Sequence, residues 1–246
     1  MDYQTCRTAR FSTADSDNLA KLSGAESMTD FEAQRVKMVD GQIRTNSVTD
    51  HHLLSAFLAT PRERFVPASL RHLAYTDQDI LIGGASGRAL IEVMPLARLI
   101  QALELGKDDV VLDVACASGY STAILGQVAG SVLGVDNDAD LVARATEILA
   151  ETGVDNAVVV EGDPKAGLVD EAPYDGILIG GAVDAVPEAI LAQLKDGGRL
   201  ATIVGRGGSA RATLFVRDGD TVSSRFLFNC AVPMVPGFEK APAFEF

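Results

Sequence analysis

The sequence predicts an α/β fold in which a mostly parallel sheet ends in an antiparallel hairpin and follows an N-terminal helical cap. The main observation is five short runs rich in Val, Ile and Leu, separated mostly by helical patterns. Their letters are VVLDVA, SVLGVD, NAVVVEG, YDGILIGG and GRLATIV. Apolar strands that alternate with helices form parallel sheets covered on both faces. A later DGD turn between two strand-like runs predicts the hairpin.

The N-terminal part is predicted to be largely helical. Residues 1–27 are polar and lack a helical or strand period, so we expect a loose extension there. Apolar residues recur at helical spacing from Asp30 to about Arg44. A second helix should start after Asp50, a favourable N-cap, and end before Pro61.

Three further segments lead from this cap into the sheet. The stretch PRERFVP lies between two prolines and should be an irregular connection. The stretch GGASG, residues 83–87, consists of small residues, which favours a flexible loop or a close approach to a ligand. After Pro95, a helix is expected to end at Gly106. The helices between the later strands are expected at Tyr120–Gln127, Ala139–Glu151 and Pro187–Leu194.

The composition excludes several classes of protein. The chain has 246 residues, 47% of them hydrophobic and 22% charged, which is typical of a globular domain. Its 34 acidic and 21 basic residues give a net charge of −13, so we expect neither nucleic acid nor a membrane surface as a partner. No apolar run approaches the roughly 20 residues of a membrane span.

Cysteine and histidine usage points to a reduced compartment without a metal site. The three cysteines lie far apart, and none stands in C-x-x-C spacing or near a histidine. We therefore expect no zinc site, no other metal and a cytoplasmic location. The N-terminus also lacks the pattern of a signal peptide.

The most informative stretch is VVLDVACASGYSTAIL, Val110–Leu125. A strand ends at Asp113, and a tight loop of small residues leads into a helix, a pattern that lets backbone approach a ligand. Asp136 ends the next strand, where an acid can accept hydrogen bonds from ribose hydroxyls, or cap the following helix. Asp163 follows the third strand and either reaches an adenine amino group or is an exposed loop acid. Acids at successive strand ends fit a ligand crevice at a topological switch point.

This ordered set resembles the S-adenosylmethionine site of class I, Rossmann-like methyltransferases. More narrowly, the chain resembles the protein-L-isoaspartate O-methyltransferase family from about Met28 to the C-terminus. The matching stretches are MVDGQIRTNSV, PRERFVPASLRHLAYTDQDILIGG, VVLDVACASGYSTAIL, PYDGILIGGAVDAVPEAILAQLKDGGRLATIV and VPMVPGF. The resemblance implies one domain over 28–246, with a helical cap and substrate loop over 28–106 and a cofactor-binding sheet over 107–246.

Two departures from the family pattern stand out. The family's loop reads acid-x-Gly-x-Gly-x-Gly, whereas Ala115 and Ala117 replace its first two glycines and only Gly119 remains. Alanine is strained wherever φ is positive. The family's Thr-x-Ser segment, which grips the substrate carboxylate, is also missing. GGASGRALIEVMP stands in its place, with Ser86 as its only hydroxyl and Arg88 as a possible carboxylate partner.

The resemblance implies a carboxyl O-methyltransferase of protein repair that uses S-adenosylmethionine, releases S-adenosylhomocysteine and acts on proteins or peptides with an isoaspartyl residue. Methyl transfer to a carboxylate needs placement and exclusion of water but no general base. Ser86 and Arg88 would face the acceptor. The residues expected to bind the cofactor are Asp113, Ala115, Ala117, Gly119, Asp136, Asn137, Asp163 and Gly180.

Two alternatives remain at this point. The first alternative is an enzyme of the same fold that methylates another acceptor, either a small molecule or a protein. The missing Thr-x-Ser favours this alternative. A degenerate, non-catalytic cofactor-binding protein is the second alternative, which the two alanines favour. A nicotinamide oxidoreductase is disfavoured, because the turn lacks G-x-G-x-x-G. The sequence leaves the oligomeric state open.

Overall fold

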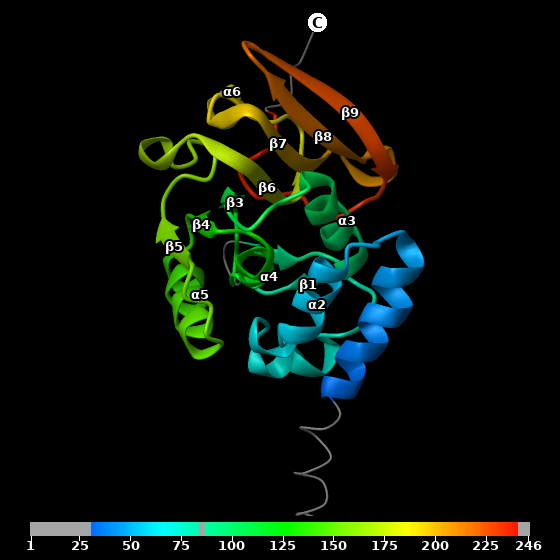
Figure 1. Cartoon of the computed structure of the whole chain (residues 1–246). Helices are drawn as coiled ribbons and strands as arrows, with labels where there is room; N and C mark the ends of the chain where they lie inside the picture. The colour runs from blue at the N-terminus through cyan, green and yellow to red at the C-terminus, as the bar shows by residue number, and fades with distance from the viewer. Residues whose placement is uncertain (1–30, 84–86, 241–246) are drawn as a thin grey trace, which may run out of the picture.

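A seven-stranded sheet forms the centre of the molecule, with strand order β5-β4-β3-β6-β7-β8-β9 (Figure 1). The computed structural model describes residues 31–83 and 87–240, so the predicted extension over 1–27 and Ser86 lie outside the described residues. The strands are β3 (Val110–Val114), β4 (Ser131–Asp136), β5 (Ala157–Glu161), β6 (Tyr174–Val183), β7 (Leu194–Val204), β8 (Arg211–Asp218) and β9 (Thr221–Asn229).

The strand directions confirm the predicted fold class. Strands β5, β4, β3, β6 and β7 pair in parallel, whereas β7 with β8 and β8 with β9 pair antiparallel. Asp218 pairs with Thr221, so the last two strands form a hairpin around Gly219, whose φ of 57° suits a tight turn. The chain moves from β3 to one side of the sheet and returns to the other side at β6, which creates a topological switch point.

Helices and short turns cover the sheet and form the cap. Residues 31–38 are helical, and the chain then widens into a π-helical turn at Val39–Ile43 and tightens into a 3₁₀ turn at Arg44–Asn46. The longer helices are α2 (His51–Ala59), α3 (Val93–Leu103), α4 (Tyr120–Val128) and α5 (Ala139–Glu151), and α6 (Glu188–Leu191) is short. Two small strands, β1 (Ile80–Leu81) and β2 (Ala89–Leu90), pair antiparallel before α3.

Local sequence signals explain several of these boundaries. The Asp50 side chain accepts hydrogen bonds from the backbone N–H groups of His52 and Leu53, which confirms the predicted N-cap of α2. Helix α3 begins at Val93, earlier than expected, because Pro95 falls in the first turn, where an N–H has no partner within the helix. It ends at Leu103 because Glu104 adopts a left-handed conformation, with φ of 51°.

One predicted helix was wrong in extent, and one predicted connection contains a short turn. The helix expected over Pro187–Leu194 is limited to α6, because Leu194 already pairs with Tyr174 in the sheet. The irregular connection PRERFVP contains a 3₁₀ turn at Arg62–Arg64, and a second one follows at Ala68–Leu73.

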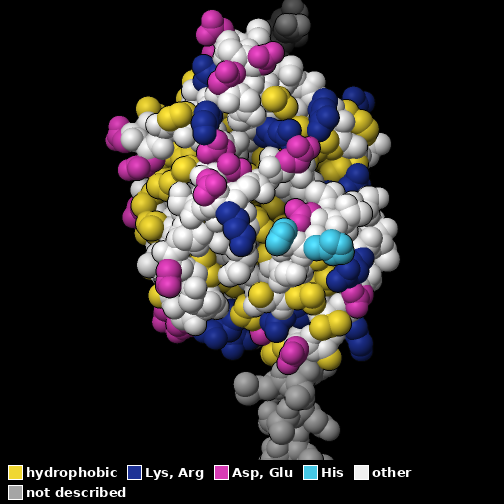
Figure 2. All heavy atoms as spheres, in the orientation of Figure 1, with side chains coloured by type: hydrophobic (Ala, Val, Ile, Leu, Met, Phe, Trp, Pro, Cys, Tyr) yellow, Lys and Arg dark blue, Asp and Glu magenta, His cyan; other side chains and the backbone are white. Residues whose placement is uncertain are grey.

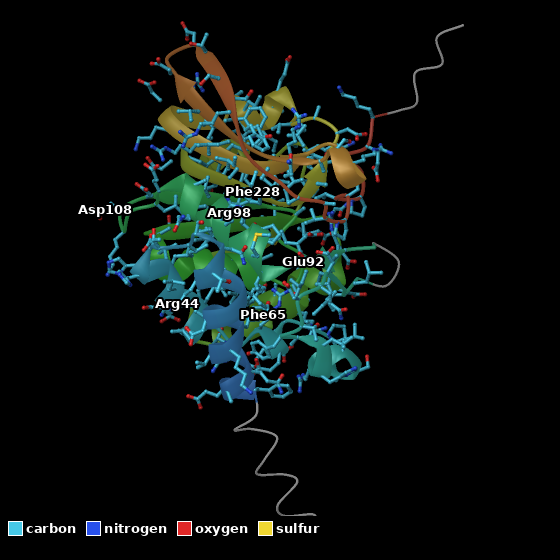
Figure 3. All side chains as sticks on the ribbon, turned by 90° about the vertical axis from the view of Figure 1, so that its right-hand side faces the viewer. Arg44, Phe65, Glu92, Arg98, Asp108 and Phe228 are labelled. Atoms are coloured by element: carbon cyan, nitrogen blue, oxygen red, sulfur yellow. The ribbon has the colours of Figure 1, made fainter. Side chains whose placement is uncertain are left out.

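The apolar core lies on both faces of the sheet. Successive residues of β6 alternate: Leu178 packs into the larger cluster with the cap and α3 to α5, whereas Ile177 and Ile179 pack into the smaller one. The hairpin is held against α3 by Arg98, whose guanidinium carbon lies 3.7 Å from the ring centroid of Phe228 (Figure 3).

The surface carries charges of both signs. Figure 2 shows acidic and basic side chains dispersed over the visible face. No helix within residues 31–83 and 87–240 is long and apolar enough to span a membrane.

Candidate cofactor-binding site

The turn between β3 and α4 has an unusual backbone. Ala115, Ala117 and Gly119 all adopt positive φ, with values of 58°, 53° and 83°. For alanine this left-handed conformation is strained, because Cβ crowds the following carbonyl oxygen. The chain therefore keeps the conformation that glycine favours at two positions where it carries alanine.

Contacts to neighbouring elements hold the turn in this shape. The Ala115 backbone N–H donates to the Val135 carbonyl at 2.8 Å, and the Ala117 N–H donates to Asp136 Oδ2 at 2.9 Å. Gly119 remains glycine for a second reason: a Cβ there would lie 3.0 Å from Cβ of Ala145 in α5. The strain is thus offset by hydrogen bonds to β4, and the close approach of α5 explains why Gly119 has no side chain.

Asp113 is fully buried at the end of β3, and only one of its two carboxylate oxygens accepts hydrogen bonds from described residues. Its Oδ2 accepts hydrogen bonds from Ser121 Oγ at 2.6 Å and Thr122 Oγ1 at 2.7 Å. Its Oδ1 has no hydrogen-bond partner among the described residues. Burial raises the pKa of Asp113 to about 7, although the two hydroxyls oppose that shift. The free oxygen is an acceptor suited to a cationic or hydrogen-bonding ligand group.

Asp136 is fully buried at the end of β4 and is occupied on both oxygens. Oδ2 accepts from the Ala117 N–H, and Oδ1 accepts from the Asp138 N–H at 3.1 Å. Arg88, from the segment before α3, lies against the same carboxylate, with Nε 3.2 Å from Oδ2. Its Nη2 donates to Asn137 Oδ1 at 2.8 Å. The structure thus brings Arg88 together with two of the predicted cofactor residues.

A second buried arginine, Arg62, anchors the segment before α3, residues 88–92, to the cap. Arg62 Nη2 donates to the Ile91 carbonyl at 2.8 Å, and Nε donates to the Ala74 carbonyl at 2.9 Å. Its guanidinium carbon lies 4.6 Å from the ring centroid of Tyr120, and the ring of Phe65 packs edge-on against Tyr120 at 5.4 Å. Figure 3 labels Phe65 within this part of the cap.

The cleft between the turn and this segment is nearly filled. A cavity of about 20 Å³ lies between them, lined by residues that include Arg62, Leu90, Ala115 and Gly180. That volume holds about one water molecule, whereas ligand pockets measure about 300–1,000 Å³. A Cβ added at Gly180 would meet nothing within 4 Å, so this position adjoins open space.

Other predicted site residues lie at the margin. Asp163 is exposed beyond β5, where its side chain accepts a hydrogen bond from the Lys165 N–H at 2.9 Å. Cys116 is buried within the turn, and burial raises the pKa of its thiol, which disfavours a nucleophilic role.

Sequence reasoning missed Arg62 and Tyr120 as site residues. Arg62 stands in a charged stretch between prolines, which reads as a surface connection, yet it is 1% exposed. The one available signal was that PRERFVP matches a family motif.

Comparisons with known proteins identify the family of the chain. The family model described as protein-L-isoaspartate(D-aspartate) O-methyltransferase (PCMT) matches residues 33–237. The chain belongs to the PCMT family. The match includes the cap, the left-handed turn, both buried acids and the hairpin.

Individual relatives support this assignment. The chain is 35% identical over 184 residues to the protein-L-isoaspartate O-methyltransferase of Koribacter versatilis, covering 75% of this chain and 82% of that one. It is 38% identical over 208 residues to the enzyme of the same name from Roseiflexus castenholzii, covering 84% and 93%.

Solved structures show the same fold. One named protein-L-isoaspartate O-methyltransferase superposes with a TM-score of 0.72 and 26% identity, over 82% of this chain and 66% of that chain. A Plasmodium falciparum protein, solved in complex with S-adenosyl-L-homocysteine, has a TM-score of 0.65 at 16% identity, over 83% of this chain and 97% of that one.

Proposed function

We propose that the protein transfers the methyl group of S-adenosylmethionine to a carboxylate, and that its acceptor is an L-isoaspartyl residue in a protein or peptide. Membership of the PCMT family supports both the reaction and the cofactor. The observation that carries the proposal is the left-handed turn after β3, which lies between two buried carboxylates at a topological switch point.

The described residues fit the chemistry of this cofactor. Asp113 offers a buried oxygen that has no partner within residues 31–83 and 87–240, and this oxygen would accept from the ammonium of the methionyl part. Asp136, with Asn137 beside it, would accept from the ribose hydroxyls, and Asp163 would reach the adenine amino group from the rim. Ala115, Ala117, Gly119 and Gly180 would lie against the ligand as small residues that permit close approach.

The bound cofactor supplies the electrophile, a methyl group on a sulfonium. Transfer to a carboxylate neutralises two opposite charges, so the chain needs no general base. Its task is to align the acceptor and exclude water. Apolar side chains do the latter: Leu90, Ile91 and Leu96 line one side of the cleft, and Val235 of the C-terminal segment lies near its end.

Arg88 is the residue we propose for the acceptor carboxylate. One of its nitrogens, Nη1, is buried without a partner among the described residues. It lines a cavity of about 10 Å³ together with Gly180 and Met234, at the edge of the cofactor cleft. Ser86, its predicted companion, lies outside the described residues.

We further propose that the protein acts in the cytoplasm, which agrees with the free thiols of Cys116 and Cys230 in the part of the chain that the structure describes.

Methylation of another acceptor is the second candidate function. The observation that favours it is the chemistry of the segment before α3. Ala89, Leu90 and Ile91 follow Arg88 directly, and residues 87–94 contain no hydroxyl side chain where the family carries Thr-x-Ser.

A matched pair of peptides tests the proposal. Purified protein is incubated with methyl-labelled S-adenosylmethionine and a peptide that contains either isoaspartate or aspartate at one position. We expect base-labile label in the isoaspartyl peptide alone. Equal labelling of the two peptides would contradict the proposed acceptor. Label that enters small molecules of a cell extract instead would support the second candidate.

A further inference from the structure

The buried pair between Arg88 and Asp136 joins two segments that are 48 residues apart in the chain. The Arg88 side chain is 3% exposed and that of Asp136 is 0% exposed. Asp136 is also the carboxylate that we propose to bind the ribose hydroxyls, so Arg88 and the ribose would bind the same group. Arg88 belongs to the segment that stands where the family carries its Thr-x-Ser pattern.

The acceptor capacity of Asp136 is already in use. An ionised carboxylate offers about four acceptor positions. Backbone N–H groups of Ala117 and Asp138 take one position on each oxygen. Arg88 Nε donates to Oδ1 at 3.3 Å and lies 3.2 Å from Oδ2, so its single N–H lies in front of the positions that remain on both oxygens. A ribose diol can therefore bind Asp136 only where Arg88 now lies.

The geometry of the pair favours its displacement. A strong arginine–carboxylate pair uses two nitrogens in a parallel fork, at about 2.7–2.9 Å. Here a single nitrogen is shared between both oxygens at longer distances, and Nη1 has no partner among the described residues. Such a pair offsets less of its desolvation penalty than a bidentate pair does, so the ribose hydroxyls can compete with it.

The backbone around Arg88 is held on one side. Three residues later, Ile91 is fixed by the hydrogen bond from Arg62, and the Arg88 carbonyl accepts from the Ile82 N–H at 2.9 Å. These contacts keep the main chain in place while leaving the guanidinium free to exchange partners. At residue 88 itself, displacement is therefore expected to move the side chain and not the main chain.

We infer that Arg88 is an internal competitor of the cofactor. It holds Asp136 in the free protein, the ribose displaces it on binding, and its return promotes release of the product. This inference rests on the proposed function for the identity of the cofactor. On this inference, Arg88 is the residue that sets cofactor affinity. Its guanidinium becomes available to the acceptor only after the cofactor has bound.

Titration calorimetry with S-adenosylhomocysteine tests the inference without turnover. Arg88→Gln removes the charge but keeps a polar side chain, and Arg206→Gln is the control, because Arg206 pairs with Asp184 on the surface. We expect Arg88→Gln to bind at least about tenfold more tightly than wild type, as for the loss of one charged hydrogen bond. Arg206→Gln should bind like wild type. Unchanged or weaker binding by Arg88→Gln would overturn the inference.

A measurement on the wild-type protein guards against misfolding of the variant. The Nε–H signal of Arg88 in ¹⁵N NMR, assigned by comparison with Arg88→Lys, should be protected from exchange in the free protein. Saturation with S-adenosylhomocysteine should shift it and remove the protection. An unchanged protected signal would refute the competition.

These results are distinguishable from a failure of the proposed function. Wild-type protein that binds S-adenosylhomocysteine but methylates no isoaspartyl peptide would contradict the acceptor, while tighter binding by Arg88→Gln would still support the competition. Conversely, isoaspartyl methylation together with unchanged affinity in Arg88→Gln would support the function and overturn the competition.

Discussion

Replacing Ala117 with glycine should leave the free energy of unfolding nearly unchanged, although Ala→Gly at a buried helical position is strongly destabilising. The φ of Ala117 is 53°, and this left-handed conformation costs a non-glycine residue about 1–2 kcal/mol. Glycine removes that strain. It also loses about 0.5–1 kcal/mol in backbone entropy and about 0.8 kcal/mol from one buried methyl group. These contributions nearly cancel.

Ala123 provides the matched control, because it is 0% exposed and lies within α4. There the glycine variant relieves no strain, so lower helix propensity and the lost methyl add to about 2 kcal/mol. The assay is urea unfolding followed by far-UV circular dichroism, since the chain contains no tryptophan. Equal losses of about 2 kcal/mol in both variants would refute the claim that the turn is strained. Ala115→Gly should behave like Ala117→Gly.

Four further predictions concern the charged groups of the site. The folded-state pKa of Asp113 is raised to about 7, so the folded protein binds more protons than the unfolded chain between about pH 4 and 7. Stability should therefore fall with rising pH by up to about 4 kcal/mol from this group, and Asp113→Asn should remove that slope in urea unfolding at several pH values. Affinity for S-adenosylmethionine should fall about tenfold per pH unit below 7, because its ammonium binds the ionised carboxylate; a flat calorimetric profile would contradict this role. Arg62→Met leaves the carbonyls of Ala74 and Ile91 without their donor and should lose about 3–5 kcal/mol in thermal or urea unfolding, whereas exposed Arg44→Met should stay within about 0.5 kcal/mol. Arg88→Lys loses the planar fork for a carboxylate and should raise KM for an isoaspartyl peptide more than it lowers kcat; the opposite split would argue against an acceptor role.

The sequence predicts those features that local chemistry determines. The five apolar runs specify the parallel strands, because buried strands need continuous Val, Ile and Leu. Asp50 caps α2, and α5 spans Ala139–Glu151 as expected, because capping and helical periodicity act over a few residues. The replacement of glycine by alanine also predicts strain in the turn, because the preference of alanine for negative φ is a property of the residue itself and needs no knowledge of tertiary contacts.

Features that depend on contacts between distant segments could not be predicted in the same way. Arg88 meets Asp136 across 48 residues, and no periodicity encodes that pair. Arg62 is buried because two carbonyl groups from later segments accept its hydrogen bonds, whereas its neighbours in sequence indicate a surface loop. The helix after Pro187 is short because pairing in the sheet begins at Leu194, which is a tertiary effect.

Titration calorimetry of the wild-type protein with S-adenosylmethionine tests the central claim most directly, namely that the cleft between the turn and Arg88 binds this cofactor. We predict one binding event per chain in the micromolar range, roughly −8 kcal/mol, which is weakened in Asp136→Asn. No heat at two temperatures from protein that remains folded by circular dichroism would contradict the claim.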